Sequence, residues 1–235
     1  MTVSSNSTWP MFSSGLRCGS KLQPRQPGFC RDRKDDLPSR KVAEMTLYPI
    51  ILTAVTAIWV AFEIWLVVRD RIRGKGKPAK DRGTLYFNFI AIVLGLTLAG
   101  FLNGKSRYFF PGGRSDTGFW IGIAIMVLGF ALRIWAVTTL GASFRTTVET
   151  HTNQAVVDSG PYRLIRHPSY SGLILMCIGD GVALQNWLSL AIAVILPLVA
   201  LLYRIHIEEQ TLVSSIGSDY QKYQSKTKRL VPWVW

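Results

Sequence analysis

The sequence predicts an all-α protein, an integral membrane helical bundle with about five transmembrane helices, of which the last two form a helical hairpin. The chain of 235 residues is 49% hydrophobic and only 17% charged, with a mean hydropathy of +0.22. A soluble domain carries about 25% charged residues, so this composition favours a membrane protein. The apolar residues are also gathered into long runs. These runs are residues 48–68, 85–102, 119–140, 170–184 and 187–203.

The lengths of the runs justify the helices one by one. A hydrocarbon core about 30 Å thick is spanned by about 20 helical residues with a rise of about 1.5 Å each. The first three runs approach or reach this length, so each is predicted to cross the membrane. The last two are shorter, and only Asn186 and its neighbours separate them, which is typical of a tight hairpin. The alternative is a pair of buried helices in a soluble core.

The chain divides into three parts. Residues 1–44 are rich in Ser, Pro, Gly and charge and have no periodicity, which is typical of a disordered extension. They lack the apolar segment of a secretory signal. One hypothesis is that translation starts at Met45, which would remove this basic stretch. Helices 1–3 occupy residues 45–140, and residues 141–235 contain a polar loop, the hairpin and a tail.

The distribution of charge predicts the topology. The formal net charge is +13, but the basic residues crowd the connection between the first two runs, so we expect no nucleic-acid partner. A short Lys/Arg-rich loop favours the cytoplasmic side. In this multi-pass topology the polar loop before the fourth run and the C-terminal tail face the cytoplasm, and the turn at Asn186 lies outside. The basic residues are Arg69, Arg71, Arg73, Lys75, Lys77, Lys80 and Arg82.

Metal and nucleotide sites of the common kinds are not predicted. Cys18, Cys30 and Cys177 are scattered, and the three histidines lack the HExxH spacing. Neither a disulfide framework nor a metal site is therefore indicated. The chain also lacks a glycine-rich phosphate loop that follows a strand.

A dense polar and aromatic loop, GPYRLIRHPSYSG at residues 160–172, connects the third and fourth runs. Pro168 disfavours the helical conformation at His167, and Ser169 can cap the helix that follows. His167 and Tyr170 are therefore expected at the cytoplasmic mouth of the bundle. The alternative is an interfacial loop in which Tyr and Arg anchor the chain to the membrane surface.

A second cluster of charge follows the last run. Arg204 and Glu208 are four residues apart and share one face of a helix, and Glu209 follows directly. The alternative to a binding site is a snorkelling arginine with a solvated ion pair. Two adjacent acidic residues next to the membrane nevertheless favour a cationic partner.

The two clusters belong to a set of motifs that resembles the isoprenylcysteine carboxyl methyltransferase family and its bacterial and archaeal relatives. The motifs are residues 160–162, 166–172, Arg204 with Glu208 and Glu209, 217–223 and 229–232. The resemblance covers about residues 140–235, and residues 1–44 have no counterpart. It implies a small helical membrane bundle whose C-terminal part wraps S-adenosylmethionine at the cytosolic face.

The resemblance also implies roles for individual residues. Arg204 is expected to face the methyl acceptor as the catalytic and substrate-binding residue. The family has a His where this chain has Gln154, and His151 lies three residues earlier. The expected cofactor contacts are Gln154, Ala155, Val156, Val157, Tyr162, His167, Pro168, Ser169, Tyr170 and Glu208.

The residue types suit this chemistry. A carboxylate such as Glu208 can partner a cationic methyl donor, and tyrosine faces suit a sulfonium. Arg204 can hold a carboxylate acceptor through two parallel hydrogen bonds. A carboxylate is ionised at neutral pH, so no strong base is required. We therefore expect a membrane-embedded methyltransferase that uses S-adenosylmethionine and acts on a lipid-like or isoprenoid acceptor, preferably at a carboxylate.

Two other functions remain open from the sequence. One is a methyltransferase acting on a small thiol or a phospholipid amine, for which only His167 or His206 could serve as a base. The other is a membrane scaffold or transporter that keeps the motif as a cytoplasmic gate.

Within the apolar runs, Glu63 and Arg133 each lie near the predicted cytoplasmic end. Charges inside a membrane usually mark partners or pathways, and pairing of these two is favoured over a direct role with substrate. The stretches 100–104 and 118–122 each begin and end with glycine, the spacing of close helix contacts.

Overall fold

The structure, a computed structural model, describes residues 39–73, 83–105, 107–141, 144 and 156–232, with side chains described from Thr46 onward. Within these residues the regular elements are helices, with two isolated bridges between extended segments. The predicted all-α class is therefore confirmed. The helices are α1 (Ser39–Arg73), α2 (Thr84–Asn103), α3 (Asp116–Leu140), η2 (Gly160–Arg163), α4 (Pro168–Ala183), α5 (Trp187–Ile216) and α6 (Ser218–Lys226).

Helices α1, α2, α3 and α5 are long and apolar enough to cross a membrane. The predicted fourth helix is present as α4, but its 16 residues give it a length of about 24 Å. The 30 residues of α5 reach about 45 Å. Because this exceeds the thickness of the hydrocarbon core, α5 carries Arg204, Glu208 and Glu209 beyond the apolar run from which it was predicted.

The N-terminal boundary can be compared only in part. Helix α1 begins at Ser39, so it includes residues 39–44 of the predicted disordered extension. The rest of that extension lies outside the described residues. Residues 74–82, which hold much of the predicted basic connection, lie outside them as well.

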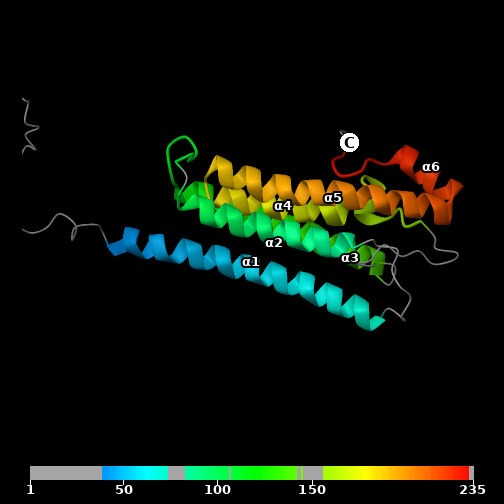
Figure 1. Cartoon of the computed structure of the whole chain (residues 1–235), viewed down its shortest axis with the longest axis horizontal. Coiled ribbons are helices and arrows are strands. Elements are labelled where there is room, and N and C mark those ends of the chain that lie inside the picture. Colours follow the sequence, from blue (N-terminus) through cyan, green and yellow to red (C-terminus); the bar gives the residue numbers. More distant parts are fainter. Residues whose placement is uncertain (1–38, 74–82, 106, 142–143, 145–155, 233–235) are drawn as a thin grey trace, which may run out of the picture.

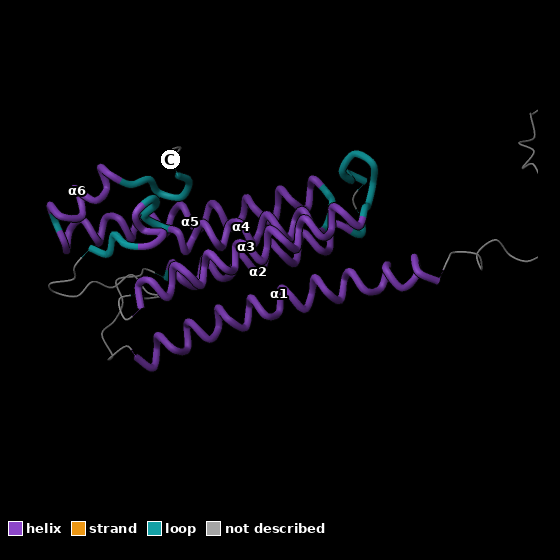
Figure 2. Tube along the Cα trace, turned by 180° about the vertical axis from the view of Figure 1, so that it is seen from behind, coloured by secondary structure: helices purple, strands orange, loops and turns teal. Residues whose placement is uncertain are grey.

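Helices α3 and α4 form the tightest pair of the bundle, and α5 packs against both α2 and α4 (Figures 1 and 2). Helix α1 runs along one side of this group and contacts α3 and α4. Helix α6 lies at the end where α5 terminates.

Glycines permit the close approach of α3 and α4. A Cβ added at Gly129 would lie 2.8 Å from the carbonyl oxygen of Gly172, and one at Gly122 would lie 2.3 Å from the nitrogen of Ala183. Such contacts are possible only without a side chain at these positions. The predicted close contact of the 118–122 stretch is therefore confirmed at Gly122. For the 100–104 stretch it is wrong, because Gly100 faces open space.

The hairpin between α4 and α5 forms as predicted. The side-chain oxygen of Asn186 accepts hydrogen bonds from the backbone nitrogens of Leu188 and Ser189, at 3.0 and 3.1 Å. This is the usual N-cap arrangement, and it starts α5 immediately after the turn.

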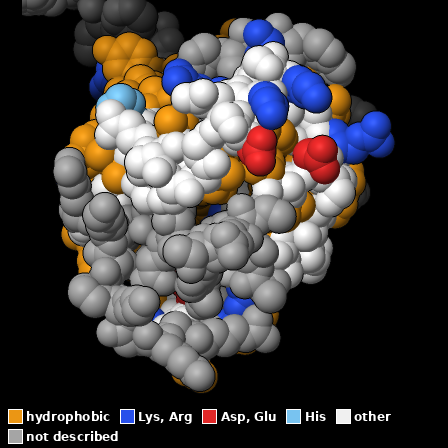
Figure 3. Space-filling model, turned by 90° about the vertical axis from the view of Figure 1, so that its right-hand side faces the viewer, with side chains coloured by type: hydrophobic (Ala, Val, Ile, Leu, Met, Phe, Trp, Pro, Cys, Tyr) orange, Lys and Arg blue, Asp and Glu red, His pale blue; other side chains and the backbone are white. Residues whose placement is uncertain are grey.

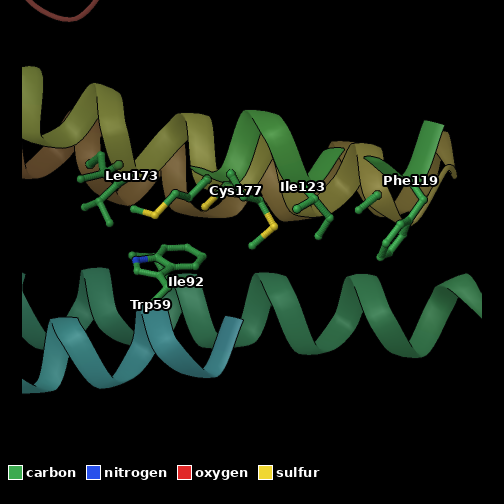
Figure 4. Close-up of a cluster of buried hydrophobic side chains, with 10 residues drawn as sticks. Trp59, Ile92, Phe119, Ile123, Leu173 and Cys177 are labelled. Carbon is green, nitrogen blue, oxygen red and sulfur yellow. The ribbon is translucent and has the colours of Figure 1, made fainter. Parts of the chain in front are cut away.

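One apolar core joins α1, α2, α3, α4 and α5. Figure 4 shows Trp59 and Ile92 facing the side chains of α3 and α4. The outward surfaces are equally apolar: Ile58, Ile90 and Leu128 are 62%, 60% and 66% exposed. Large apolar side chains on an outer surface fit a bundle surrounded by lipid.

Candidate functional site

The predicted site residues that the structure describes gather mainly at the end of the bundle that carries α6, where Lys and Arg side chains lie at the surface (Figure 3). Three segments meet there: the loop leading into α4, the last turns of α5 and the chain after α6. The backbone nitrogens of Arg166 and His167 donate to the carbonyl oxygens of Lys228 and Arg229, at 2.7 and 3.0 Å. The C-terminal segment therefore holds the 160–167 loop in place.

Tyrosines attach this loop to its surroundings. The Tyr223 hydroxyl donates to the carbonyl oxygen of Tyr162 at 2.7 Å, and the Tyr162 hydroxyl donates to that of Ala136 at 3.4 Å. Burial raises the pKa of Tyr162, and it raises the pKa of Tyr223 to about 12. Both hydroxyls therefore remain protonated donors near neutral pH. Tyr162, predicted to contact the cofactor, is buried and links η2 to α3 and α6.

Glu209 is buried and is held by two arginines. Arg166 Nε donates to its Oε1 at 2.8 Å, and Arg229 Nε donates to its Oε2 at 3.1 Å. His167 Nε2 lies 3.4 Å from Oε1 without the alignment of a hydrogen bond. Glu209 thus fixes the loop and the C-terminal segment to α5.

Glu208 differs from its neighbour in its partners. Its Oε2 accepts a 2.7 Å hydrogen bond from the Tyr170 hydroxyl and lies 3.9 Å from His167 Nδ1. Its side chain is 28% exposed. No Lys or Arg among the described residues forms an ion pair with it. Glu208 is therefore the acidic group of this cluster that is left to receive a cation.

Arg204 is buried, with 3% exposure, between α2 and α4. Its Nε donates to the Tyr170 hydroxyl at 2.8 Å, and its Nη1 donates to Thr84 Oγ1 at 3.0 Å. A hydroxyl has one donor and two acceptor positions, so Tyr170 can accept from Arg204 while it donates to Glu208. The continuous chain Thr84–Arg204–Tyr170–Glu208 therefore joins three helices.

His167 lies against this chain. Its ring stacks on that of Tyr170, with centroids 5.5 Å apart and planes 9° apart. Its φ of −121° and ψ of 54° leave the helix, although ψ falls short of the predicted extended value. The two rings form one flat aromatic pair beside Glu208.

The predicted cap of α4 is wrong. His167 occupies the N-cap position without a side-chain cap, and Pro168 and Ser169 lie in the first turn. Ser169 instead receives the guanidinium of Arg133, whose Nη1 donates to both its carbonyl and its hydroxyl oxygen. The hydroxyl therefore fixes α4 to α3.

The predicted pairing of Glu63 with Arg133 is confirmed. Arg133 Nε and Nη2 donate to the two carboxylate oxygens of Glu63 at 2.9 and 2.7 Å. Trp59 Nε1 donates to the same carboxylate at 3.3 Å. With the contact to Ser169, this pair connects α1 and α3 to the first turn of α4.

The remaining predicted cofactor contacts lie in the chain before η2. Gln154 and Ala155 lie outside the described residues, as does His151. Val156 and Val157 are half-buried in the irregular chain before η2.

Sequence reasoning did not single out Thr84, whose partner Arg204 is 120 residues away. The sequence feature that could have indicated Thr84 is that it is a polar residue directly before the second apolar run.

Residues 120–214 match the model of the isoprenylcysteine carboxyl methyltransferase (ICMT) family. Among curated relatives, the chain is 33% identical to the protein-S-isoprenylcysteine O-methyltransferase of Tribolium castaneum, over 54% of this chain and 46% of the relative. It is 32% identical to protein-S-isoprenylcysteine O-methyltransferase B of Arabidopsis thaliana, over 54% of this chain and 66% of that protein. The corresponding Saccharomyces cerevisiae enzyme is also 32% identical, with 48% of each chain covered.

The fold is similar to that of the eukaryotic intramembrane Ras methyltransferase ICMT, with a TM-score of 0.54 and 29% identity. That match covers 60% of this chain and 52% of the solved one. The chain thus spans about half to two thirds of the length of the relatives it matches.

Proposed function

Because residues 120–214 match the model of the isoprenylcysteine carboxyl methyltransferase family, we propose that the chain methylates the carboxylate of an isoprenylated acceptor with S-adenosylmethionine as donor. The observation that carries the proposal is the hydrogen-bonded chain from Arg204 through Tyr170 to Glu208. It joins a buried cation, suited to an anionic acceptor, to an acidic group suited to a cationic donor.

The described residues fit S-adenosylmethionine. When bound, this cofactor supplies a methyl group on a sulfonium. Glu208 accepts one hydrogen bond from Tyr170 and keeps further lone pairs for an ammonium or for ribose hydroxyls. The stacked rings of His167 and Tyr170 offer an aromatic face for a cation. Glu209 takes no part in binding, because Arg166 and Arg229 already occupy it.

Arg204 orients the acceptor. A guanidinium buried at the end of an apolar bundle attracts a carboxylate strongly, since the surroundings screen charge poorly. One carboxylate oxygen would form the new bond to the methyl carbon as the bond from that carbon to sulfur breaks, and the donor would leave as a neutral thioether. The product is a neutral ester, which Arg204 holds less tightly than the anion, so reaction itself favours release into the bilayer.

The acceptor arrives through the membrane and the cofactor from the cytoplasm. The lipid-facing surfaces of α1, α2 and α3 carry large apolar side chains, which suit an acceptor already dissolved in the bilayer. Arg71 and Arg73 end α1, and Arg71 bonds Tyr86 near the start of α2. Basic residues at this end favour the cytoplasmic side.

The test is incubation of the purified protein with methyl-labelled S-adenosylmethionine and N-acetyl-S-farnesylcysteine. We expect a labelled product that releases volatile methanol in base, because a methyl ester hydrolyses and an N-methyl or S-methyl group does not. Label that stays bound in base, or no transfer to this acceptor, would contradict the proposal.

A further inference from the structure

Asn88 presents a buried amide that the proposed reaction does not yet use. It lies within α2, is 8% exposed, and its Oδ1 has no hydrogen-bond partner in the part of the chain that the structure describes. An unpaired polar atom is especially unfavourable within a membrane-spanning segment. Because buried polar groups are nearly always paired, this oxygen calls for a partner that arrives from elsewhere.

The position of Asn88 places it beside the acceptor side of the site. It belongs to one buried stripe of α2, formed by Thr84, Asn88, Ile92, Gly95 and Ala99. The stripe faces α5 along its length: Arg204 donates to Thr84 at one end, and Ser189 donates to the carbonyl oxygen of Ala99 at the other.

Asn88 is one turn from Thr84, about 6 Å along the helix axis, toward the interior of the bundle. Ile92, the next residue of the stripe, already lies in the apolar core beside Trp59 (Figure 4). Asn88 therefore lies between Thr84, which binds the Arg204 guanidinium, and the apolar core that begins at Ile92.

The chemistry of the amide restricts its partner. An asparagine side chain has one carbonyl acceptor and two N–H donors, so it is complementary to a peptide group. If the side-chain oxygen and nitrogen of Asn88 are exchanged by a rotation of the amide, the unpaired atom becomes an N–H donor. The carbonyl oxygen of a peptide group can accept from it. In a C-terminal residue, the peptide nitrogen and the carboxylate are attached to the same Cα atom. A carboxylate on Arg204 thus brings that peptide group toward Asn88.

We propose that Asn88 binds the amide adjacent to the acceptor carboxylate, so that the enzyme prefers a C-terminal residue in peptide linkage over an acid that lacks the amide. This inference rests on the proposed function. It adds a residue that sets the choice of substrate and leaves methyl transfer to the Arg204–Tyr170–Glu208 chain.

The test compares two acceptors with the full-length protein in bilayers. N-acetyl-S-farnesylcysteine has the amide, and S-farnesyl-3-mercaptopropionic acid has the same farnesyl thioether and a carboxylate but no amide. For Asn88→Leu, which keeps the size and removes the polar group, we expect kcat/KM to fall about tenfold for the first acceptor. The value for the second should change less than about twofold.

Two controls separate binding from folding. Asn103→Leu is the same change at the far end of α2 and should leave the ratio of the two kcat/KM values unchanged. The melting temperature of Asn88→Leu should equal or exceed that of the wild type, because an unpaired buried group is removed. If this variant does not fold, Asn88→Ala gives the same comparison.

The outcomes also distinguish this inference from the proposed function. Equal loss for both acceptors, or no loss for either, would overturn the role of Asn88 while methylation by the wild type still supports the proposed function. A wild-type protein that methylates neither acceptor would overturn both.

Discussion

The adjacent carboxylates of Glu208 and Glu209 have different partners and different exposure. Glu209 is buried and paired with Arg166 and Arg229, whereas Glu208 is partly exposed and is held by the Tyr170 hydroxyl. Successive residues of a helix point about 100° apart, so one faces the C-terminal segment and the other the aromatic pair. The sequence alone does not separate their roles, because the partners of Glu209 come from distant segments.

This difference predicts opposite effects of the same substitution. Glu209→Gln should lower the free energy of unfolding by about 3 kcal/mol, since it leaves the buried Arg166 and the partly exposed Arg229 without their carboxylate. Glu208→Gln should leave the melting temperature nearly unchanged and abolish turnover. Thermal unfolding in detergent and an assay of methyl transfer measure the two effects. Equal destabilisation by both variants would contradict the assignment.

A second prediction concerns Arg204. Arg204→Ala should reduce methyl transfer by at least about a hundredfold, because it removes the charge that orients the acceptor, while binding of S-adenosylmethionine persists. Arg204→Lys should restore only part of the activity, since an ammonium cannot form two parallel hydrogen bonds. Loss of cofactor binding in both variants would instead make Arg204 part of the cofactor site.

At this scale the resemblance predicted Arg204, Tyr170 and Glu208, and the structure brings them into one chain of hydrogen bonds. Reasoning from the sequence pattern missed Thr84 and wrongly predicted the hydroxyl of Ser169 as the cap of α4. Both errors have the same cause: the partners, Arg204 and Arg133, are 120 and 36 residues away. Local patterns do not reveal which distant helix face a side chain will meet.

At the scale of helices, the Glu63–Arg133 pair attaches α1 to the rest of the bundle and to the start of α4. Glu63→Gln and Arg133→Gln should each lower the melting temperature. The double variant should lose less than the sum of the two, because each single change already breaks the pair. Thermal unfolding of the four proteins measures this coupling, and additive losses would show that the pair contributes nothing of its own.

The contact between α3 and α4 depends on the absence of side chains. A Cβ at Gly172 would lie 2.7 Å from the carbonyl oxygen of Gly129, so Gly172→Ala must separate the helices and should cost about 1–3 kcal/mol. Gly100→Ala is the matched control: it faces open space and should be neutral or stabilising. Equal unfolding temperatures for the two variants would contradict close packing at Gly172.

The helices themselves were largely predictable. The runs 85–102 and 119–140 nearly coincide with α2 and α3. The thickness of the hydrocarbon core sets both the length of the apolar run and the length of the helix that spans it. Helix α5 continues 13 residues past its apolar run to Ile216. Apolar composition marks where the bilayer ends, whereas a helix stops where its capping and packing change, here at Gly217.

For the whole molecule, the fold class, the hairpin and the similarity to the isoprenylcysteine carboxyl methyltransferase family were predictable, because long apolar runs and ordered motifs are carried by the sequence itself. The assembly of the site was not. It draws on Thr84, Arg133, His167, Glu208 and Arg229, which lie on five separate segments. The packing of α4 against α3 and α5, the packing of α2 against α5 and the hydrogen bonds of the C-terminal segment together bring these segments to one place.

Equilibrium binding of radiolabelled S-adenosylmethionine to the purified protein tests the central claim most directly. We expect saturable binding of one molecule per chain by the wild type and by Arg204→Ala, and its loss in Glu208→Gln. Absence of saturable binding by the folded wild-type protein would contradict the view that this cluster holds the methyl donor.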